Sequence, residues 1–190
     1  MPGVGGSHSC RPLCVLLALT SMLGTMNEYR RPVKMIDVGG KAVTVRTAVA
    51  SGQLVVRPET LDRIRKGDLV KGDALHTARV AGIMAAKRTS EFVPLCHPLP
   101  LEGVDVDIKC VDGAEARCNA VMVVVRVVTS AKTGVEMEAL TAVTAALMTL
   151  YDMAKSIDHN MVIGEVKLDA KTGGSSGDYV RPDARAVFPE

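Results

Sequence analysis

The sequence predicts an α+β fold, in which helices pack on one face of a mainly antiparallel sheet. Residues 133–155 repeat apolar side chains at helical spacing, whereas residues 42–50 and 104–110 alternate apolar and polar side chains, as strands do. Asp112-Gly113 separates two strand-like runs and predicts a hairpin turn. A chain of 190 residues is long enough to bury one full core.

The first part of the domain is predicted to hold two strands and a short helix. Residues 42–50 alternate as a half-buried strand, and the apolar run 54–56 predicts a second one. Pro58 favours the start of a helix, because proline suits the first helical turn. Gly67 favours its end, because glycine readily adopts the left-handed conformation.

A second helix is predicted to begin after Asp73, which would cap it, and to run to about residue 88. Gly82 costs about 1 kcal/mol relative to alanine inside a helix, so we expect it to allow close packing. Residues 94–100 contain three prolines and predict a stiff, extended segment around a Cys-His pair.

The second part of the domain is predicted to hold a hairpin, the long helix and a last strand. The hairpin strands are residues 104–110 and about 116–128, and the last strand is residues 162–168. Residues 170–178 are rich in Gly and Ser, a composition typical of a flexible tail or a loop.

The long helix, residues 133–155, carries two different faces. One is an apolar stripe of Leu and Val, and the other has ionisable groups at both ends with small or soft residues between them: Glu138, Thr141, Ala145, Met148, Asp152 and Lys155. Such a row suggests a lined cleft, because unpaired charge is costly on a packed face. Two simpler interpretations stay open. Thr133 and Glu136 would fit a capping box, and Asp152 and Lys155 an exposed ion pair.

Composition limits the function. The net charge is +2 and aromatics make up 3% of the residues, which argues against a nucleic-acid partner. The five cysteines form no CxxC pair, so we expect no zinc site and a reducing compartment. The apolar run 13–23 is too short to span a membrane. We expect no metal, no cofactor and no membrane partner.

The chain is predicted to comprise three parts. Residues 1–25 would be a poorly ordered extension or a spurious start, residues 26–178 a single catalytic domain, and residues 179–190 a flexible tail. A cytoplasmic location is expected, although residues 1–25 also have some features of a targeting segment.

The polar candidates lie on separate segments, and their chemistry converges. Basic groups beside a Gly-Gly-Ser-Ser-Gly loop suit a polyphosphate, two carboxylates suit a purine ring, and an Asp/Lys pair suits proton transfer if burial lowers the lysine pKa. Each residue also has an ordinary structural interpretation: a solvent-facing strand residue, a loop charge, a structural histidine, a helix cap or a tail residue. The candidates are Arg46, Lys71, His97, Glu136, Glu138, Asp152, Lys155 and Lys171.

Four sequence runs then point further. KGDALHTARVAGIMAAKRTSEFVPLCHPL, TGVEMEALTAV, LYDMAK and the KTGG segment, in this order, resemble the cyclic pyranopterin monophosphate synthases, the C proteins of molybdenum-cofactor biosynthesis. The resemblance covers about residues 35–178. It implies a lyase that converts a cyclised dihydroguanosine triphosphate to cyclic pyranopterin monophosphate and diphosphate, without metal.

The resemblance also implies roles for particular residues. Asp152 and Lys155 match the catalytic acid/base pair. The substrate-binding positions are Leu95, Cys96, His97, Glu136, Met137 and Glu138, together with the basic lining residues Arg46, Lys71 and Lys171. The family has a ferredoxin-like related α+β fold and forms a hexamer built from dimers, with sites shared between subunits. We therefore expect a homo-oligomer in which Lys71 and Asp152 of one site come from different chains.

Two departures and two alternatives accompany the resemblance. Residues 26–34, MNEYRRPVK, stand where the family usually has a Thr-His-x-Asp segment, and His76 stands where a less polar residue is expected. A triphosphate hydrolase is one alternative, but it would need a magnesium-binding carboxylate set. A non-catalytic purine-triphosphate-binding module is the other, and it would have no use for the Asp152/Lys155 pair.

Overall fold

The computed structural model describes residues 32–113 and 118–182. The chain divides into two compact units, Met1–Lys34 and Met35–Glu190. The first unit is described only at its last three residues, which are exposed, so the expectations for residues 1–25 lie outside the described residues. The fold below is that of the second unit.

The second unit contains one antiparallel sheet with the strand order β2-β3-β1-β4-β5. Its strands are β1 Thr44–Val55, β2 Gly103–Val111, β3 Ala120–Ala131, β4 Val162–Thr172 and β5 Tyr179–Val180. The predicted hairpin is confirmed, since β2 pairs antiparallel with β3 from Gly103 to Val111.

The two strands predicted for residues 42–50 and 54–56 form one continuous strand, β1. The three residues between them, Ser51 to Gln53, stay in register with β3, where Ser51 pairs with Val124 and Gly52 with Val123. Gly52 permits this because a Cβ there would lie 2.8 Å from atoms of Leu147 and Val143. The interruption in the hydrophobic pattern is therefore a point of close helix approach and not a turn.

β5 was not expected, because it falls in the segment predicted to be a flexible tail. Tyr179 pairs with Lys171 and Val180 with Ala170. The Arg181 side chain adds a hydrogen bond from its Nε to the carbonyl of Leu168 at 2.8 Å. The start of this segment is thus held against β4, and residues 183–190 lie outside the described residues.

The helices are α1 Pro58–Lys66, α2 Ala74–Ala86, α3 Thr89–Phe92 and α5 Glu136–Ala154. Two predicted boundaries hold: Gly67 ends α1 with φ of 68°, and Asp73 caps α2 by accepting from the backbone N–H of His76. α2 ends at Ala86 and α5 begins at Glu136, so each is shorter than the predicted range. The short α3 was not expected. Within the described residues, no helix is long and apolar enough to span a membrane.

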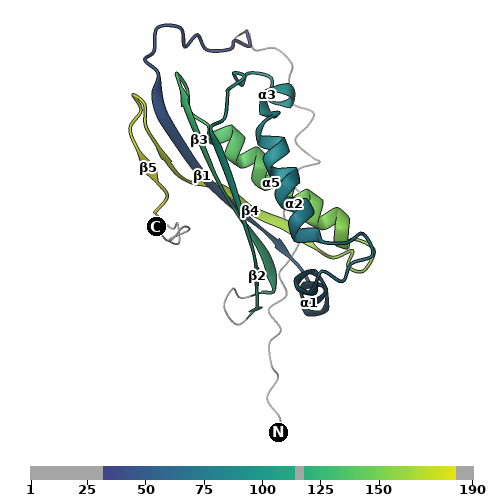
Figure 1. Ribbon diagram of the computed structural model, residues 1–190. Helices are drawn as coiled ribbons and strands as arrows, with labels where there is room; N and C mark the ends of the chain where they lie inside the picture. Colours follow the sequence, from purple (N-terminus) through teal and green to yellow (C-terminus); the bar gives the residue numbers. More distant parts are fainter. Residues whose placement is uncertain (1–31, 114–117, 183–190) are drawn as a thin grey trace, which may run out of the picture. The chain divides into compact units, whose positions relative to one another are not determined.

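With the short helices α1 and α3 and the two-residue strand β5 set aside, the elements follow the order β1-α2-β2-β3-α5-β4, and β1 lies between β3 and β4. The predicted α+β class, with helices packed on an antiparallel sheet, is confirmed. α2 and α5 lie side by side on one face of the sheet (Figure 1). The core forms between them and the valines of β3, with Leu147 and Leu150 of α5 fully buried.

Gly82 explains how closely α2 and α5 approach. A Cβ at this position would lie 3.1 Å from the backbone carbonyl oxygen of Ala142 and 3.6 Å from the Cβ of Ala146. The expectation that Gly82 serves close packing is therefore confirmed. The contact fixes α5 against the domain, and α5 carries three of the polar candidates, Glu136, Glu138 and Asp152, with Lys155 as its C-cap residue.

Asp158 joins the end of α5 to the start of α1. Its carboxylate is 1% exposed and accepts from the backbone N–H of Arg57 at 3.0 Å and from the Thr60 hydroxyl at 3.1 Å. It therefore caps α1, whose own N-cap residue makes no side-chain cap. Burial raises the pKa of Asp158, but these hydrogen bonds, one from Asn160 and the nearby Arg57 charge outweigh it and leave the pKa below its usual value.

Asp158→Ala should lower the free energy of unfolding by about 3 kcal/mol, because it leaves buried donors without an acceptor. Urea denaturation at pH 7 measures this loss. The depressed pKa makes the stabilisation of the wild type complete above the unfolded pKa of about 3.9 and lost as the pH falls through the lower folded value. Equal stabilities of wild type and Asp158→Ala at pH 7 would contradict the capping role.

Candidate active site

The first group of polar candidates surrounds a cavity of about 170 Å³ at the start of α5, which we name the anion pocket. Four basic side chains line it together with one acidic side chain and the Gly/Ser-rich loop. Its lining includes Lys41, Arg46, Lys132, Thr133, Gly134, Glu136, Lys171, Gly173, Ser175 and Ser176. The first turn of α5 also faces it, and the N-terminus of a helix favours bound anions.

Glu136 and Lys171 form an ion pair across the anion pocket, with 3.1 Å between Glu136 Oε1 and Lys171 Nζ. Glu136 is the first residue of α5, and the N-cap residue, Val135, has no side-chain cap. The capping-box interpretation is therefore wrong, because it required Glu136 three residues inside the helix. Glu136 instead faces a charge contributed by β4, as a site residue would.

Arg46 is part of the pocket wall. Its side chain is buried, and its guanidinium donates to the carbonyl of Gly173 at 3.3 Å and to that of Lys132 at 3.5 Å. The interpretation of Arg46 as a solvent-facing strand residue is therefore wrong. Its Nε has no hydrogen-bond partner within the described residues.

The Gly/Ser-rich segment is the loop of the β4–β5 hairpin. Gly173, Gly174 and Gly177 all have positive φ, and the backbone N–H of Gly173 donates to Asp178 Oδ1 at 2.9 Å. Gly174 cannot carry a side chain, because its Cβ would overlap the Arg46 guanidinium. The glycines thus allow the positive φ angles of the loop and its close packing against Arg46.

The proline-rich segment meets α5 near Glu138. Glu138 is 4% exposed, and burial raises its pKa, with a smaller contribution from Glu136. Burial also raises the pKa of the Cys96 thiol, and the Glu138 charge raises it further. The effect of the Glu138 charge on Cys96 indicates that the two segments are neighbours. His97 is half-buried, whereas Leu95 and Met137 are exposed.

The second group, which we name the Asp152 cluster, consists of Lys71, Asp152 and Lys155. Asp152 accepts from Lys71 Nζ at 2.6 Å and pairs with Lys155 Nζ at 2.8 Å. Lys155 and then Lys71 lower the pKa of Asp152 to about 2, and Asp152 raises that of Lys155. Proton transfer by this pair was expected to require burial that lowers the pKa of Lys155. In the single chain the pKa of Lys155 is raised instead, because Lys155 pairs with Asp152 and all three side chains are about half exposed.

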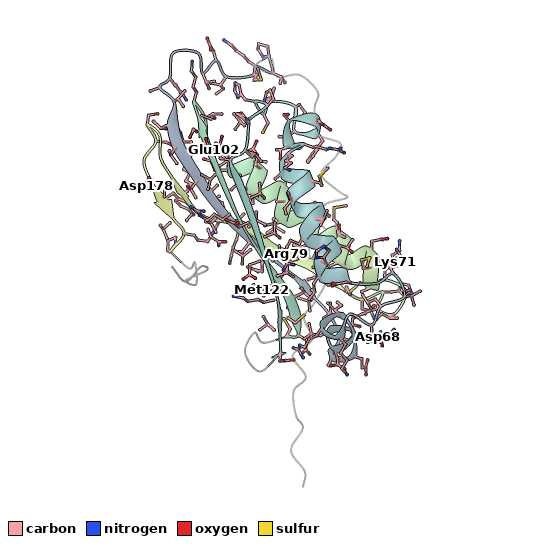
Figure 2. The ribbon with its side chains drawn as sticks, viewed as in Figure 1. Asp68, Lys71, Arg79, Glu102, Met122 and Asp178 are labelled. Carbon is pink, nitrogen blue, oxygen red and sulfur yellow. The ribbon has the colours of Figure 1, made fainter. Side chains whose placement is uncertain are left out.

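The expectation that Lys71 and Asp152 come from different chains is wrong, because they are bonded within one chain. The two groups of site candidates are instead far apart within one chain. Glu136 and Asp152 are sixteen residues apart on α5, which is about 24 Å along the helix axis. Lys71 and Asp178, which marks the anion-pocket loop, lie on opposite sides of the domain in Figure 2. The site candidates thus form two distant groups.

Between the two groups lies an apolar groove of about 260 Å³ on the outer side of α5. It is lined by Phe92, Met137, Leu140, Thr141, Thr144, Ala145 and Met148. Thr141, Ala145 and Met148 belong to the row that the sequence suggested as the lining of a cleft. The groove is open, with Met148 60% and Phe92 58% exposed.

Lys41 and Lys132 line the anion pocket but were not predicted. Lys132 directly precedes the TGVEMEALTAV run, so its position next to a family motif was a usable signal. Lys41 lies in a turn before β1, and no pattern in the sequence linked it to distant segments. Within the described residues, no group of three His, Cys, Asp or Glu side chains could hold a metal ion.

Comparisons with known proteins show that the chain is similar to one family. Residues 35–174 match the family model described as the MoaC family. A cyclic pyranopterin monophosphate synthase of Brevibacillus brevis is 50% identical over 163 residues, which is 86% of this chain and 98% of that protein. Cyclic pyranopterin monophosphate synthase 3 of Mycobacterium tuberculosis is 52% identical over 151 residues, which is 80% of this chain and 82% of that protein.

A third relative, the cyclic pyranopterin monophosphate synthase of Roseiflexus castenholzii, is 53% identical over 147 residues, or 77% of this chain and 90% of that protein. The family match begins before Arg46 and ends after Lys171, so it includes both polar groups and every predicted site residue. The chain belongs to the MoaC family.

Proposed function

We propose that the protein is a cyclic pyranopterin monophosphate synthase, a lyase of molybdenum-cofactor biosynthesis that acts on a cyclised dihydroguanosine triphosphate. The observation that carries this proposal is the family match across both polar groups, at about half identity to proteins of that name. The products are cyclic pyranopterin monophosphate and diphosphate. No cofactor enters the reaction that we propose.

The anion pocket supports a role in binding the triphosphate. Lys41 and Lys171 bring ammonium groups to it, and the glycines of residues 173–177 expose backbone next to it. Such groups bind phosphate oxygens by charge-assisted hydrogen bonds. Glu138 supports recognition of the purine, because its buried carboxyl group can form hydrogen bonds with the ring nitrogens.

The Asp152 cluster supports a role in proton transfer. Asp152 is ionised at neutral pH, since its pKa is about 2, and it can accept a proton or hold a lysine ammonium in place. Lys155 is protonated in this state, because pairing with Asp152 raises its pKa, and the raised pKa makes the ammonium a weak proton donor. Burial against substrate and a second chain would lower that pKa and let Lys155 exchange protons during the reaction.

The distance between the two groups supports a site built from two chains. If α5 packs antiparallel against α5 of a second copy, Glu136 of one chain approaches Asp152 of the other, because Thr144 lies midway between them. The apolar groove around Thr144 would then be covered by its own symmetry mate. We take this dimer as the unit of the hexamer that the family resemblance implies.

We also place the protein in a reducing compartment such as the cytoplasm. Cys96 and Cys110 carry free thiols, and each has a pKa raised first by burial. Such cysteines behave as small hydrophobic residues and not as disulfide partners.

The proposed activity has a direct test. The purified protein is incubated with the cyclised dihydroguanosine triphosphate, and the products are followed as pterin fluorescence after oxidation and as released diphosphate. We expect equal amounts of both products. Diphosphate without pterin would indicate a triphosphate hydrolase, and tight binding without either product would indicate a binding module.

Lys171→Ala should weaken binding of the triphosphate substrate by roughly 10- to 100-fold, because a hydrogen bond to a charged group contributes about 1.5–3 kcal/mol. The loss should be much smaller for a nucleoside analogue without phosphates. Titration calorimetry with both ligands measures the difference. Lys109→Ala, which removes an exposed lysine paired only with Asp107 on β2, is the matched control. Equal losses for the two ligands would show that Lys171 acts through folding.

A further inference from the structure

The turn that carries Lys41 into the anion pocket is short and exposed. Its backbone is closed locally, by the N–H of Gly39 donating to Asp37 Oδ1 at 2.7 Å and the N–H of Lys41 donating to the Val38 carbonyl at 3.0 Å. These bonds give the turn its shape but do not fix its place relative to the sheet. β1 begins three residues after Lys41, at Thr44.

Lys132 supplies a bond that does fix the turn. Its ammonium donates to the carbonyl of Gly39 at 2.6 Å, across 93 residues of sequence. The direct contact of the Lys132 ammonium is therefore with the backbone of the turn, and the turn carries Lys41 to the anion pocket.

Lys132 is itself held in place by Arg46. Its carbonyl accepts from the Arg46 guanidinium, which also donates to the carbonyl of Gly173. Arg46 and Lys132 therefore connect three segments that are distant in sequence. These are the turn of residues 37–41, residues 132–134 just before α5, and the loop of residues 173–177. All three segments line or adjoin one cavity.

We propose that Lys132 is a positioning residue of the anion pocket: by holding the Gly39 carbonyl it brings the Lys41 ammonium to the phosphates of the substrate. This inference rests on the proposed function. Lys41 is the ligand in this arrangement, since its ammonium has no hydrogen-bond or ion-pair partner within the described residues. Lys132 acts through it.

The test is a double-mutant cycle with diphosphate as the probe, measured by titration calorimetry on the full-length protein. Lys41→Ala should weaken diphosphate binding about tenfold, and Lys132→Ala about three- to tenfold. The double variant should bind diphosphate about as weakly as Lys41→Ala alone. Moving the turn has no further effect on binding once the Lys41 ammonium is absent. Lys132→Arg should restore binding, since a guanidinium can donate to the same carbonyl.

Two further readouts separate positioning from a general loss of structure. In Lys132→Ala, KM for the triphosphate substrate should rise while kcat stays within about twofold, and the melting temperature should match that of the Lys109→Ala control. Losses that multiply in the double variant would overturn the positioning role and make Lys132 a direct ligand. A wild-type protein that does not bind diphosphate would overturn the anion pocket itself, together with this inference.

Discussion

Replacing Lys155 by alanine, or Asp152 by asparagine, should lower turnover of the cyclised dihydroguanosine triphosphate by a factor of roughly 10²–10⁴ each. Both changes remove a group of the Asp152 cluster, in which the two side chains lie 2.8 Å apart. Neither change disturbs the core, because both side chains are about half exposed. Single-turnover measurements of pterin formation give the loss directly.

Diphosphate binding provides the control for this prediction. Neither Asp152 nor Lys155 lines the anion pocket, so Lys155→Ala and Asp152→Asn should still bind diphosphate. A variant that keeps near wild-type turnover would remove its residue from the catalytic assignment. A variant that loses turnover together with its melting temperature would indicate a structural role instead.

Mixing two inactive variants should restore activity when their defects lie in different clusters. Co-expressed Lys171→Ala and Asp152→Asn chains form mixed dimers in which one site carries both defects and the other carries none. With random pairing, half of the dimers are mixed, so about a quarter of all sites are intact. The specific activity should therefore rise from near zero to about a quarter of the wild-type value.

The structure supplies a matched control for this mixing experiment. Lys71 and Asp152 are bonded within one chain, so Lys71→Ala mixed with Asp152→Asn should remain inactive in every pairing. Native mass spectrometry confirms that mixed oligomers are present. Recovery in both mixtures, or in neither when mixed oligomers are confirmed, would contradict a site that joins the anion pocket of one chain to the Asp152 cluster of another.

The amino-acid sequence by itself determined the elements that depend on near neighbours. The Asp112-Gly113 turn, the Asp73 cap and the left-handed Gly67 are set by the conformations that single residues prefer, and the structure confirms the elements they bound. The 3.6-residue period of α5 was equally visible. The four sequence motifs were also long enough to identify the family without any knowledge of tertiary contacts.

Only the tertiary structure decided which distant groups meet. Glu136 fits a capping box locally, but its ion pair with Lys171, 35 residues away, depends on the position of β4 beside β1. Lys71 joins Asp152 because α2 packs along α5 at Gly82. Lys132 reaches Gly39 because β3 and β1 are paired at Thr44 and Ala131. Periodicity and propensity describe a segment against its own neighbours, whereas these contacts depend on sheet register and helix packing, which no local pattern encodes.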